Sequence, residues 1–407
     1  MPTVVLAGTL DTKGHEYAFL RERVLEQGVD VLLVDVGVHP PQIEPDVSRE
    51  EVAAAAGNDA SALAAAGDRG EATAAMASGA AIVLQRLHAD GRVDGVLGMG
   101  GSGGSSIVTT AMRALPVGVP KLMVSTMASG DTRPYVGAVD VTMMYSVVDI
   151  AGINSVSARI LTNAAGAIAG MVRATMPPLE HKQLVGATMF GVTTPGVTRA
   201  RQRLEELGYE VLVFHATGTG GQSMEALVAG GFLAGVLDLT TTELADELVG
   251  GVLSAGPDRL TAAGDVGLPQ VVSLGALDMV NFGPRDTVPA RFEGRNLYVH
   301  NPTITLMRTS AEECRELGRE VGRKLAAAKG ATALFIPHAG VSMISVEGQP
   351  FHDPAADEAL LAGLAETGGD VEVHHLDCDV NDERFAVAMA DRLHELITAT
   401  RSPQGDD

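Results

Sequence analysis

The sequence contains little cysteine and few aromatic residues. Its 407 residues include two cysteines, five tyrosines, nine phenylalanines and no tryptophan. Two cysteines cannot form a disulfide framework or a four-cysteine zinc site, so we expect reduced thiols and a cytoplasmic location. The scarcity of aromatic rings leaves few platforms on which the bases of a single-stranded nucleic acid can stack.

Basic residues are also scarce. Lys and Arg number 29 against 51 Asp and Glu, which gives a formal net charge of −22 at pH 7. This balance disfavours a surface that wraps a nucleic acid or lies on an anionic membrane, but it leaves room for a local basic pocket that holds one phosphate group. No apolar run reaches the roughly 18 residues of a membrane span. The start, MPTVVLAGTLDTKGHE, lacks the basic region of a signal peptide and is expected to be a strand.

Glycine and aliphatic residues are abundant by contrast, with 48 glycines in the chain. Short, nearly continuous runs of Val, Leu and Ile, typical of strands buried on both faces of a parallel sheet, alternate with amphipathic helical stretches. The pattern predicts a doubly wound, Rossmann-like α/β fold with mainly parallel sheets. The expected strands are residues 3–7, 29–35, 95–99, 121–125, 141–147, 186–190, 209–214, 235–239, 270–274, 296–300, 331–336 and 371–375. The expected helices include 17–27, 73–89, 197–207, 311–328 and 382–398.

The chain is expected to form two such domains. The two halves of the chain begin with a similar strand, glycine turn, helix and strand. These segments are VVLAGTLDTKGHEYAFLRERVLEQGVDVLLVDVG and ATMFGVTTPGVTRARQRLEELGYEVLVFHATG. Either a duplication or independent use of one βαβ pattern explains the similarity. Pro177 and Pro178 end the preceding helix and favour a join near residues 176–182. We predict a glycine-loop nucleotide-binding domain at 1–180 and a second α/β domain at 181–407. We also expect a long connection with one or two short helices at 35–66 and a frayed tail at 401–407.

Three loops of the first half follow expected strands, at the edge of the sheet where open α/β folds bind ligands. In the first loop, residues 8–14, Asp11 can hold a metal ion and Lys13 can meet a phosphate as a point charge. The structural alternative is a strand-to-helix turn in which Asp11 or Thr12 caps the helix. The candidate cofactor-binding residues of this loop are Gly8, Thr9, Asp11, Thr12 and Lys13.

The second loop, GMGGSGGSS at residues 98–106, is the richest in glycine. Glycines remove Cβ atoms where backbone N–H groups can face an anion, and a following helix N-terminus favours phosphate. The loop has neither the Gly-Lys-Ser/Thr of a Walker motif nor the spacing of a dinucleotide fingerprint, and a flexible turn is the alternative. The candidates are Gly100, Gly101, Ser102, Gly103, Gly104 and Ser105.

The third loop, residues 125–133, carries hydroxyls and a glycine after another buried strand. Asp131 can be a metal ligand or a helix cap, and Arg133 can pair with phosphate or remain solvated. Asp149, in the apolar segment YSVVDIAGIN, is costly to bury unless it is paired or caps a helix. The candidates are Thr126, Ser129, Gly130, Asp131 and Asp149.

These motifs together carry a family resemblance. GTLDTK, GMGGSGGSS, STMASGD and YSVVDIAGIN, with FGVTTPGV, FHATGTGGQSMEALV, LDLTTTEL, GALDMVNFG and HNPTITLMRTS, resemble the family of the ATP-binding N-terminal domain of the tomato mosaic virus resistance protein. The resemblance covers almost the whole chain. It implies two α/β domains, an ATP site in the first (with Mg²⁺ as a candidate companion), and a barrel-type hydrolase as a candidate partner subunit. The antiviral role of the plant protein is not transferred.

In the second half, several titratable residues follow expected strands. His215 ends one strand, and Glu225 lies in the first turns of the next helix, beyond another small-residue cradle. The structural alternatives are a hydrogen-bonded histidine and a helix-dipole partner. If all strands are parallel, these residues face one crevice, where they can relay protons or bind a divalent metal, with Arg308 as an anion clamp. The candidate catalytic residues are His215, Glu225, Asp278, His300, Arg308 and His338, with Asp238 at the same edge.

Three functions remain open from these residues. The first is an ATP-binding enzyme, such as a hydrolase, lyase or transferase, acting on a sugar acid, another small carboxylate or a phosphorylated metabolite. The second is a nucleotide-dependent protein-binding module, and the third is an enzyme that binds a phosphorylated substrate without ATP. A dehydrogenase is disfavoured, although Asp35 ends the second strand where a ribose partner can lie. A homo-oligomer is expected from base rates alone.

Overall fold

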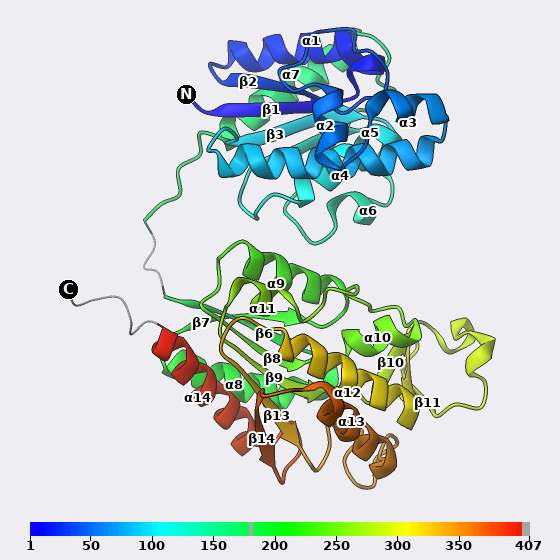
Figure 1. The fold of residues 1–407 in the computed structure, drawn as a ribbon, viewed down its shortest axis with the longest axis vertical. Coiled ribbons are helices and arrows are strands. Elements are labelled where there is room, and N and C mark those ends of the chain that lie inside the picture. Colours follow the sequence, from blue (N-terminus) through cyan, green and yellow to red (C-terminus); the bar gives the residue numbers. More distant parts are fainter. Residues whose placement is uncertain (179–181, 401–407) are drawn as a thin grey trace. The chain divides into compact units, whose positions relative to one another are not determined.

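The computed structural model describes residues 1–178 and 182–400. The chain folds as two units, residues 1–178 and 179–407 (Figure 1). The expected boundary at 180/181 and the tail at 401–407 lie outside the described residues. None of the helices within the described ranges is both long and apolar enough to span a bilayer.

Unit 1 is built on a five-stranded parallel sheet with the order β2-β1-β3-β4-β5. All six residues of β3 are buried, as the continuous run GVLGMG predicts for a strand covered on both faces. The strands are β1 (Thr3–Gly8), β2 (Asp30–Asp35), β3 (Gly95–Gly100), β4 (Lys121–Ser125) and β5 (Thr142–Tyr145).

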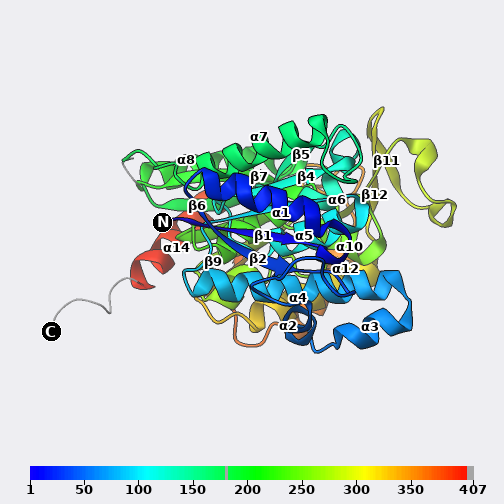
Figure 2. The same ribbon diagram turned by 90° about the horizontal axis from the view of Figure 1, so that it is seen from above.

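Helices cover both faces of this sheet (Figures 1 and 2). α1 (Leu10–Glu26) and α7 (Ser155–Met171) pack on one face, and α4 (Arg69–Ala89) and α5 (Ser102–Arg113) pack on the other. The connection at 35–66 contains two short helices, as predicted. The remaining helical segments are α2 (Arg49–Ala55), α3 (Ala60–Ala66), η1 (Thr126–Ser129) and α6 (Arg133–Val136).

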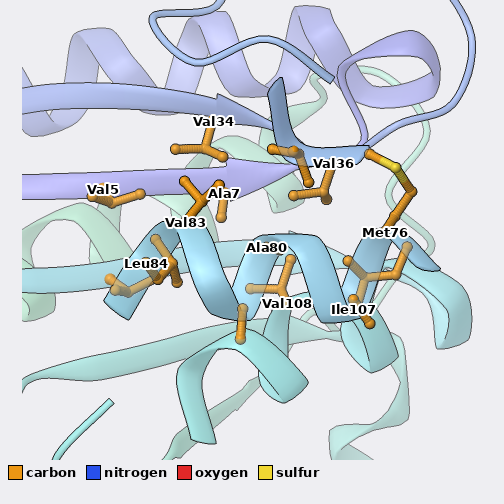
Figure 3. Close-up of a cluster of buried hydrophobic side chains, with 14 of the residues drawn as sticks. Val5, Ala7, Val34, Val36, Met76, Ala80, Val83, Leu84, Ile107 and Val108 are labelled. Atoms are coloured by element: carbon orange, nitrogen blue, oxygen red, sulfur yellow. The ribbon is translucent and has the colours of Figure 1, made fainter. Parts of the chain in front are cut away.

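One core of unit 1 joins the sheet to α4 and α5 (Figure 3). Alternate residues of β1, Val5 and Ala7, face this layer, while Val4 and Leu6 face α1 and α7. β1 is therefore covered by helices on both faces. Side chains labelled in the figure include Val34, Val36, Met76, Ala80, Val83, Leu84, Ile107 and Val108.

Unit 2 repeats this plan with a six-stranded parallel sheet in the order β14-β13-β9-β8-β6-β7. Counted from the edge strand β7, the order is β7-β6-β8-β9, which is the second, first, third and fourth strand of the unit, as in unit 1. The doubly wound, mainly parallel fold predicted from the sequence is therefore confirmed. The strands are β6 (Leu184–Met189), β7 (Glu210–His215), β8 (Gly235–Thr240), β9 (Gln270–Gly275), β13 (Thr332–Pro337) and β14 (Glu372–Leu376).

The second sheet is covered by α8 (Thr194–Glu206) and α14 (Glu383–Thr400) on one face. The helices of the other face are α9 (Thr219–Ala229), α10 (Glu243–Val249), α11 (Ala262–Val266), α12 (Ala311–Ala326) and α13 (Pro354–Thr367). Short turns η2 (Gly191–Thr193), η3 (Arg285–Thr287) and η4 (Ala290–Phe292) complete the unit.

A small antiparallel sheet in unit 2 was not expected. It has the order β10-β12-β11, with β10 (Met279–Phe282), β11 (Leu297–Asn301) and β12 (Ile304–Arg308). Placing residues 296–300 in the parallel sheet was wrong. Pro302 and Thr303 alone join β11 to β12, whereas a parallel pair needs a crossover of about a dozen residues.

Candidate functional site

The strand order of unit 1 reverses between β1 and β3, because the chain runs outward from β1 to β2 and then returns to β3. At such a switch point the loops that follow the two strands diverge and leave a crevice at the carboxyl edge. A cavity of about 590 Å³ opens there, and we call it the unit 1 cavity. Its volume lies within the range of about 300–1,000 Å³ that is typical of small-molecule sites.

One wall of the unit 1 cavity is the start of α5. Gly100, Gly101, Ser102, Gly103 and Gly104 line it, and the N-cap Gly101 provides no side chain to cap the helix. The first N–H groups of a helix have no intrahelical acceptor and carry partial positive charge. These amides are therefore available to an anion in the cavity.

Two basic residues line the same cavity. Arg69, the first residue of α4, lines the cavity, and a Cβ built on Gly103 would lie 3.4 Å from Nη2 of Arg69. Lys13 lines it from the first turn of α1, where its ammonium donates a hydrogen bond to the carbonyl of Ile150. The α5 amides and the Arg69 guanidinium thus converge on one small region.

Asp11 brings an incompletely paired carboxylate to the cavity. Its Oδ2 accepts a hydrogen bond of 3.1 Å from the amide of His39, whereas its buried Oδ1 has no partner among the described residues. The approach depends on Gly37, because a Cβ there would lie 2.8 Å from Oδ1 of Asp11. Asp11 lines the unit 1 cavity, so its carboxylate is the group there that can accept from a ligand hydroxyl or bind a divalent cation.

The structure therefore brings most of the first two predicted loops together. Thr9, Asp11, Thr12 and Lys13 line the unit 1 cavity, as do residues 100–104 of the second loop and Asp149. Much of each predicted loop is already helical, since α1 begins at Leu10 and α5 at Ser102.

Gly8 and Ser105 lie outside the cavity lining. A Cβ on Gly8 would fall 2.0 Å from the ring of Tyr17, so this glycine makes room for a buried tyrosine. The Tyr17 hydroxyl donates to the carbonyl of Ala7 at 2.6 Å and accepts from the amide of Met99 at 2.8 Å, which ties β1 to β3. Ser105 is fully buried, with its Oγ 2.6 Å from Oγ of Ser125.

The third predicted loop also stands apart from the cavity lining. Asp131 forms an exposed ion pair of 2.7 Å with Arg133 and accepts from the Arg133 amide, and these bonds hold the pKa of Asp131 at about 2. None of the candidate residues of this loop lines the cavity; these are Thr126, Ser129, Gly130 and Asp131.

Two contributors were missed by the sequence reasoning. These are the turn after β2, with Gly37, Val38 and His39, and the start of α4 at Asp68 and Arg69. A β2-β1-β3 order places the turn after β2 beside the other two loops, so the turn could have been inferred from topology. Nothing in the local sequence singles out Arg69.

Asp35 does not serve as a ribose partner. It is fully buried, and its Oδ1 accepts from the amides of Leu10 at 3.1 Å and Gly37 at 2.9 Å. Burial raises the pKa of Asp35 to about 6. The position that kept a dehydrogenase open is therefore part of the interior.

In unit 2, the expected anion cradle before α9 is already filled. Glu243 Oε1 accepts from the amides of Gly218 at 2.7 Å and Gly221 at 3.0 Å, and Glu243 is fully buried. The chain's own carboxylate thus occupies the helix N-terminus, so the interpretation of residues 215–225 as a ligand cradle is wrong.

A buried arginine explains the neighbouring carboxylates. Arg259, which the sequence reasoning missed, bonds Glu243 Oε2 at 2.6 Å and Asp238 Oδ1 at 2.7 Å. Glu225 lies 3.2 Å from Arg259 and also accepts from the amides of Leu260 and Ala262. These bonds use both Glu225 oxygens, and we therefore assign Glu225 a structural role in place of the expected catalytic one.

The expected single crevice of histidines does not form. His215 is the last residue of β7, the edge strand of the sheet, whereas His338 follows β13, four strands away. At roughly 4.8 Å per strand, the two strands are about 19 Å apart. His300 lies on β11 in the separate antiparallel sheet. Within residues 1–178 and 182–400, no three His, Cys, Asp or Glu side chains are grouped so that they could hold a metal ion.

Arg308 and Asp278 are buried close to each other. Arg308 donates to Asp357 Oδ1 at 2.6 Å and to the carbonyl of Phe351 at 2.8 Å, so it is not a free anion clamp. Asp278 accepts from the hydroxyl of Ser342 at 2.7 Å, and burial raises its pKa to about 6.

Comparisons with known proteins agree on one family. Residues 2–177 match the N-terminal domain, and residues 182–397 the C-terminal domain, of the uncharacterised protein family UPF0261. A UPF0261 protein of Clostridium tetani is 53% identical over 97% of this chain and 98% of its own length. The ToMV resistance protein Tm-1(GCR237) of Solanum lycopersicum is 40% identical over 98% of this chain, which spans 56% of that longer protein.

A solved structure of UDP-N-acetylglucosamine 2-epimerase from Rickettsia bellii is 11% identical, covering 67% of this chain and 78% of its own. Its TM-score of 0.22 is too low to support any comparison of function. The sequence matches extend over nearly the whole chain and confirm the predicted resemblance. The chain belongs to the UPF0261 family, to which the tomato Tm-1 proteins are related.

Proposed function

We propose that unit 1 binds a phosphate-bearing nucleotide in its cavity, and that ATP is the ligand. The observation that carries the proposal is the convergence of the uncapped N-terminus of α5 with Arg69 at the β1/β3 switch point, in a cavity that Lys13 also lines. Helix amides and fixed cations stabilise phosphate oxygens together, because both present positive charge to the same group.

The remaining lining suits the rest of a nucleotide. Val36, Val38, Leu63 and Ile107 also line the cavity and offer apolar contacts to a base. The Asp11 carboxylate at the cavity fits a ribose hydroxyl or a Mg²⁺ ion that accompanies the phosphates. Mg²⁺ would neutralise phosphate charge and thereby offset the carboxylates of Asp11, Asp68 and Asp149 at the same cavity.

The proposed activity is that of an ATP-binding metabolic protein that acts on a small carboxylate or phosphorylated metabolite. The alternatives are a nucleotide-dependent protein-binding module and an enzyme that binds a phosphorylated substrate without ATP. All three functions place a phosphate group at the N-terminus of α5, so the ligand has to be identified before the reaction. The family resemblance favours ATP.

Calorimetric titration of the full chain with ATP, AMP and inorganic phosphate, each with and without Mg²⁺, tests the ligand. We expect ATP to bind most tightly and Arg69→Gln to weaken it by about tenfold or more, since a hydrogen bond to a charged group contributes about 1.5–3 kcal/mol. Arg92→Gln is the matched control, because Arg92 is exposed in the same unit and does not line the cavity.

Tight binding of phosphate or a sugar phosphate without any gain from the adenosine would favour the phosphorylated-substrate alternative. Equal losses for Arg69→Gln and Arg92→Gln, or no nucleotide binding at all, would show that the unit 1 cavity is not the site. Release of phosphate from ATP only in the presence of a metabolite would favour an enzyme over a binding module.

A further inference from the structure

A second cavity lies in unit 2, where β9 and β13 end. Its volume is about 420 Å³, and we call it the unit 2 cavity. The segment that follows β13, from His338 to Val341, forms one side, and the start of α13 forms another. It lies at the carboxyl edge of the sheet, which is the ligand-bearing edge of an α/β fold.

The charged groups of this cavity are all acidic. Glu347, Asp357 and Glu358 line it, and no Lys or Arg does. Arg308, 4% exposed, lies behind Asp357 and fixes its carboxylate through the bond to Oδ1. Glu347 and Glu358 are exposed and form no ion pair with any described residue. The start of α13 is capped by Asp353, which accepts from the amide of Ala356, and Asp357 is paired with Arg308. The charges left to the unit 2 cavity are those of Glu347 and Glu358, and they favour a cation over a phosphate or carboxylate.

The imidazoles of the cavity add hydrogen-bond acceptors. His352 Nδ1 lies 3.2 Å from the carbonyl oxygen of Ser345, and a carbonyl only accepts, so Nδ1 carries the proton and a neutral ring presents Nε2 as an acceptor. His338 Nε2 lies 2.9 Å from His375 Nδ1, and the two stacked rings share that hydrogen bond. A ligand that donates hydrogen bonds matches this lining.

An apolar cavity of about 180 Å³ adjoins the unit 2 cavity, and the two share Ile336 and Leu361. Leu334, Leu364 and Val373 complete an aliphatic lining between α13 and the sheet. A dry hydrocarbon cavity of about 150 Å³ is large enough to hold a benzene ring. Ile336 and Leu361 therefore give the unit 2 cavity an apolar part beside its acidic part.

We infer that the unit 2 cavity is a second small-molecule site, and that its ligand is an organic ammonium compound with an apolar body. The ammonium group lies among Glu347, Asp357 and Glu358, and the apolar body enters the space beside Ile336 and Leu361. This site requires no nucleotide in unit 1, so it stands or fails independently of the function proposed above.

A matched set of probes tests this inference on the full chain. Benzylamine, benzyl alcohol and benzoate share one ring and differ in charge, and methylamine keeps the charge without the ring. By saturation-transfer NMR and calorimetry at low salt we expect benzylamine to bind best, benzyl alcohol and methylamine less well, and benzoate least. Added salt weakens benzylamine binding, because the attraction is between charges.

Exposed carboxylates of the lining give variants that keep the fold. We expect Glu347→Gln and Glu358→Gln each to weaken benzylamine binding by about two- to fivefold, the range of exposed ion pairs. Glu293→Gln makes the same charge change at an exposed position outside the lining and should leave binding unchanged. Benzoate binding as well as benzylamine, equal effects of all three variants, or no binding at millimolar concentration would each overturn the inference.

Discussion

The Glu243 carboxylate accepts a hydrogen bond of 2.7 Å from the backbone amide of Gly218. With the bond from Gly221, it places a buried anion of the chain itself at the start of α9, in a unit with the same strand order as unit 1. At the start of α5 in unit 1, the N-cap Gly101 has no side chain and the first turn lines a cavity. The two glycine-rich turns look alike in sequence, yet only the one in unit 1 is left accessible to a ligand.

The contrast predicts the effect of Gly103→Asp. The new carboxylate would lie beside Arg69 and the α5 amides and would occupy the proposed phosphate position. We expect ATP affinity to fall by about tenfold or more, while an acidic residue in the first helical turn stabilises the fold by about 0.3–1 kcal/mol. Calorimetric titration and urea unfolding measure the two effects. Gly103→Asn, of similar size but uncharged, should lose less affinity, and an equal loss would point to steric blockage alone.

Removing the buried carboxylate in unit 2 should be severe. Glu243→Ala leaves the amides of Gly218 and Gly221 without an acceptor and deprives the fully buried Arg259 of one partner. We expect the free energy of unfolding to fall by about 3–5 kcal/mol, as for other broken buried ion pairs. Urea unfolding of unit 2 measures this loss. The exposed Glu210→Ala is the control, and a loss below about 1 kcal/mol in Glu243→Ala would contradict the assigned role.

Gly8 is predicted to tolerate no side chain. Gly8→Ala would place a Cβ 2.0 Å from the Tyr17 ring, which is fully buried and bonded to β1 and β3. We expect a loss of about 1–3 kcal/mol or more from this overpacking. Gly166→Ala is the matched control, because Gly166 lies within α7 with open space around its Cβ position and should gain about 0.5–1 kcal/mol. Thermal unfolding of both variants should therefore shift in opposite directions.

The stability of unit 1 should depend on pH through Asp35. Burial raises its pKa to about 6, so between the usual carboxyl value of 3.8 and about 6 the folded state binds more protons than the unfolded state. Stability from this group is present at low pH and is lost as pH rises through that window. The difference between the two pKa values corresponds to a free energy of about 3 kcal/mol. Asp35→Asn should flatten this decline.

Hydrogen exchange of the β1 and β2 amides, measured between pH 4 and 7, follows unit 1 specifically. The comparison is Asp30→Asn, because Asp30 starts the same strand and is exposed. It should retain the slope of the unchanged protein. A flat profile in the unchanged protein would show that Asp35 does not titrate in this window.

Local patterns were sufficient for the fold class and for much of the unit 1 cavity. In runs such as VVLAG and GVLGMG, successive apolar residues point to opposite faces of the strand, so both faces must be covered to bury them. This requirement alone implies helices on both sides of a parallel sheet. The glycine turn before α5 follows such a strand. Its place at the carboxyl edge was therefore predictable without knowledge of any long-range contact.

Which polar residue reaches a cavity was decided by tertiary contacts. Asp35 and Glu243 lie at or just after strand ends, as Asp11 does, but both are buried and held by backbone amides or by Arg259 from elsewhere in the chain. His300 was misplaced because residues 304–308 were not recognised as a strand, and these residues form β12, the antiparallel partner of β11. The sequence by itself determined which residues are buried, because burial follows from the local alternation of apolar residues. Only the tertiary structure decided whether a carboxylate at a strand end is paired or open to a ligand, because its partners come from distant parts of the chain.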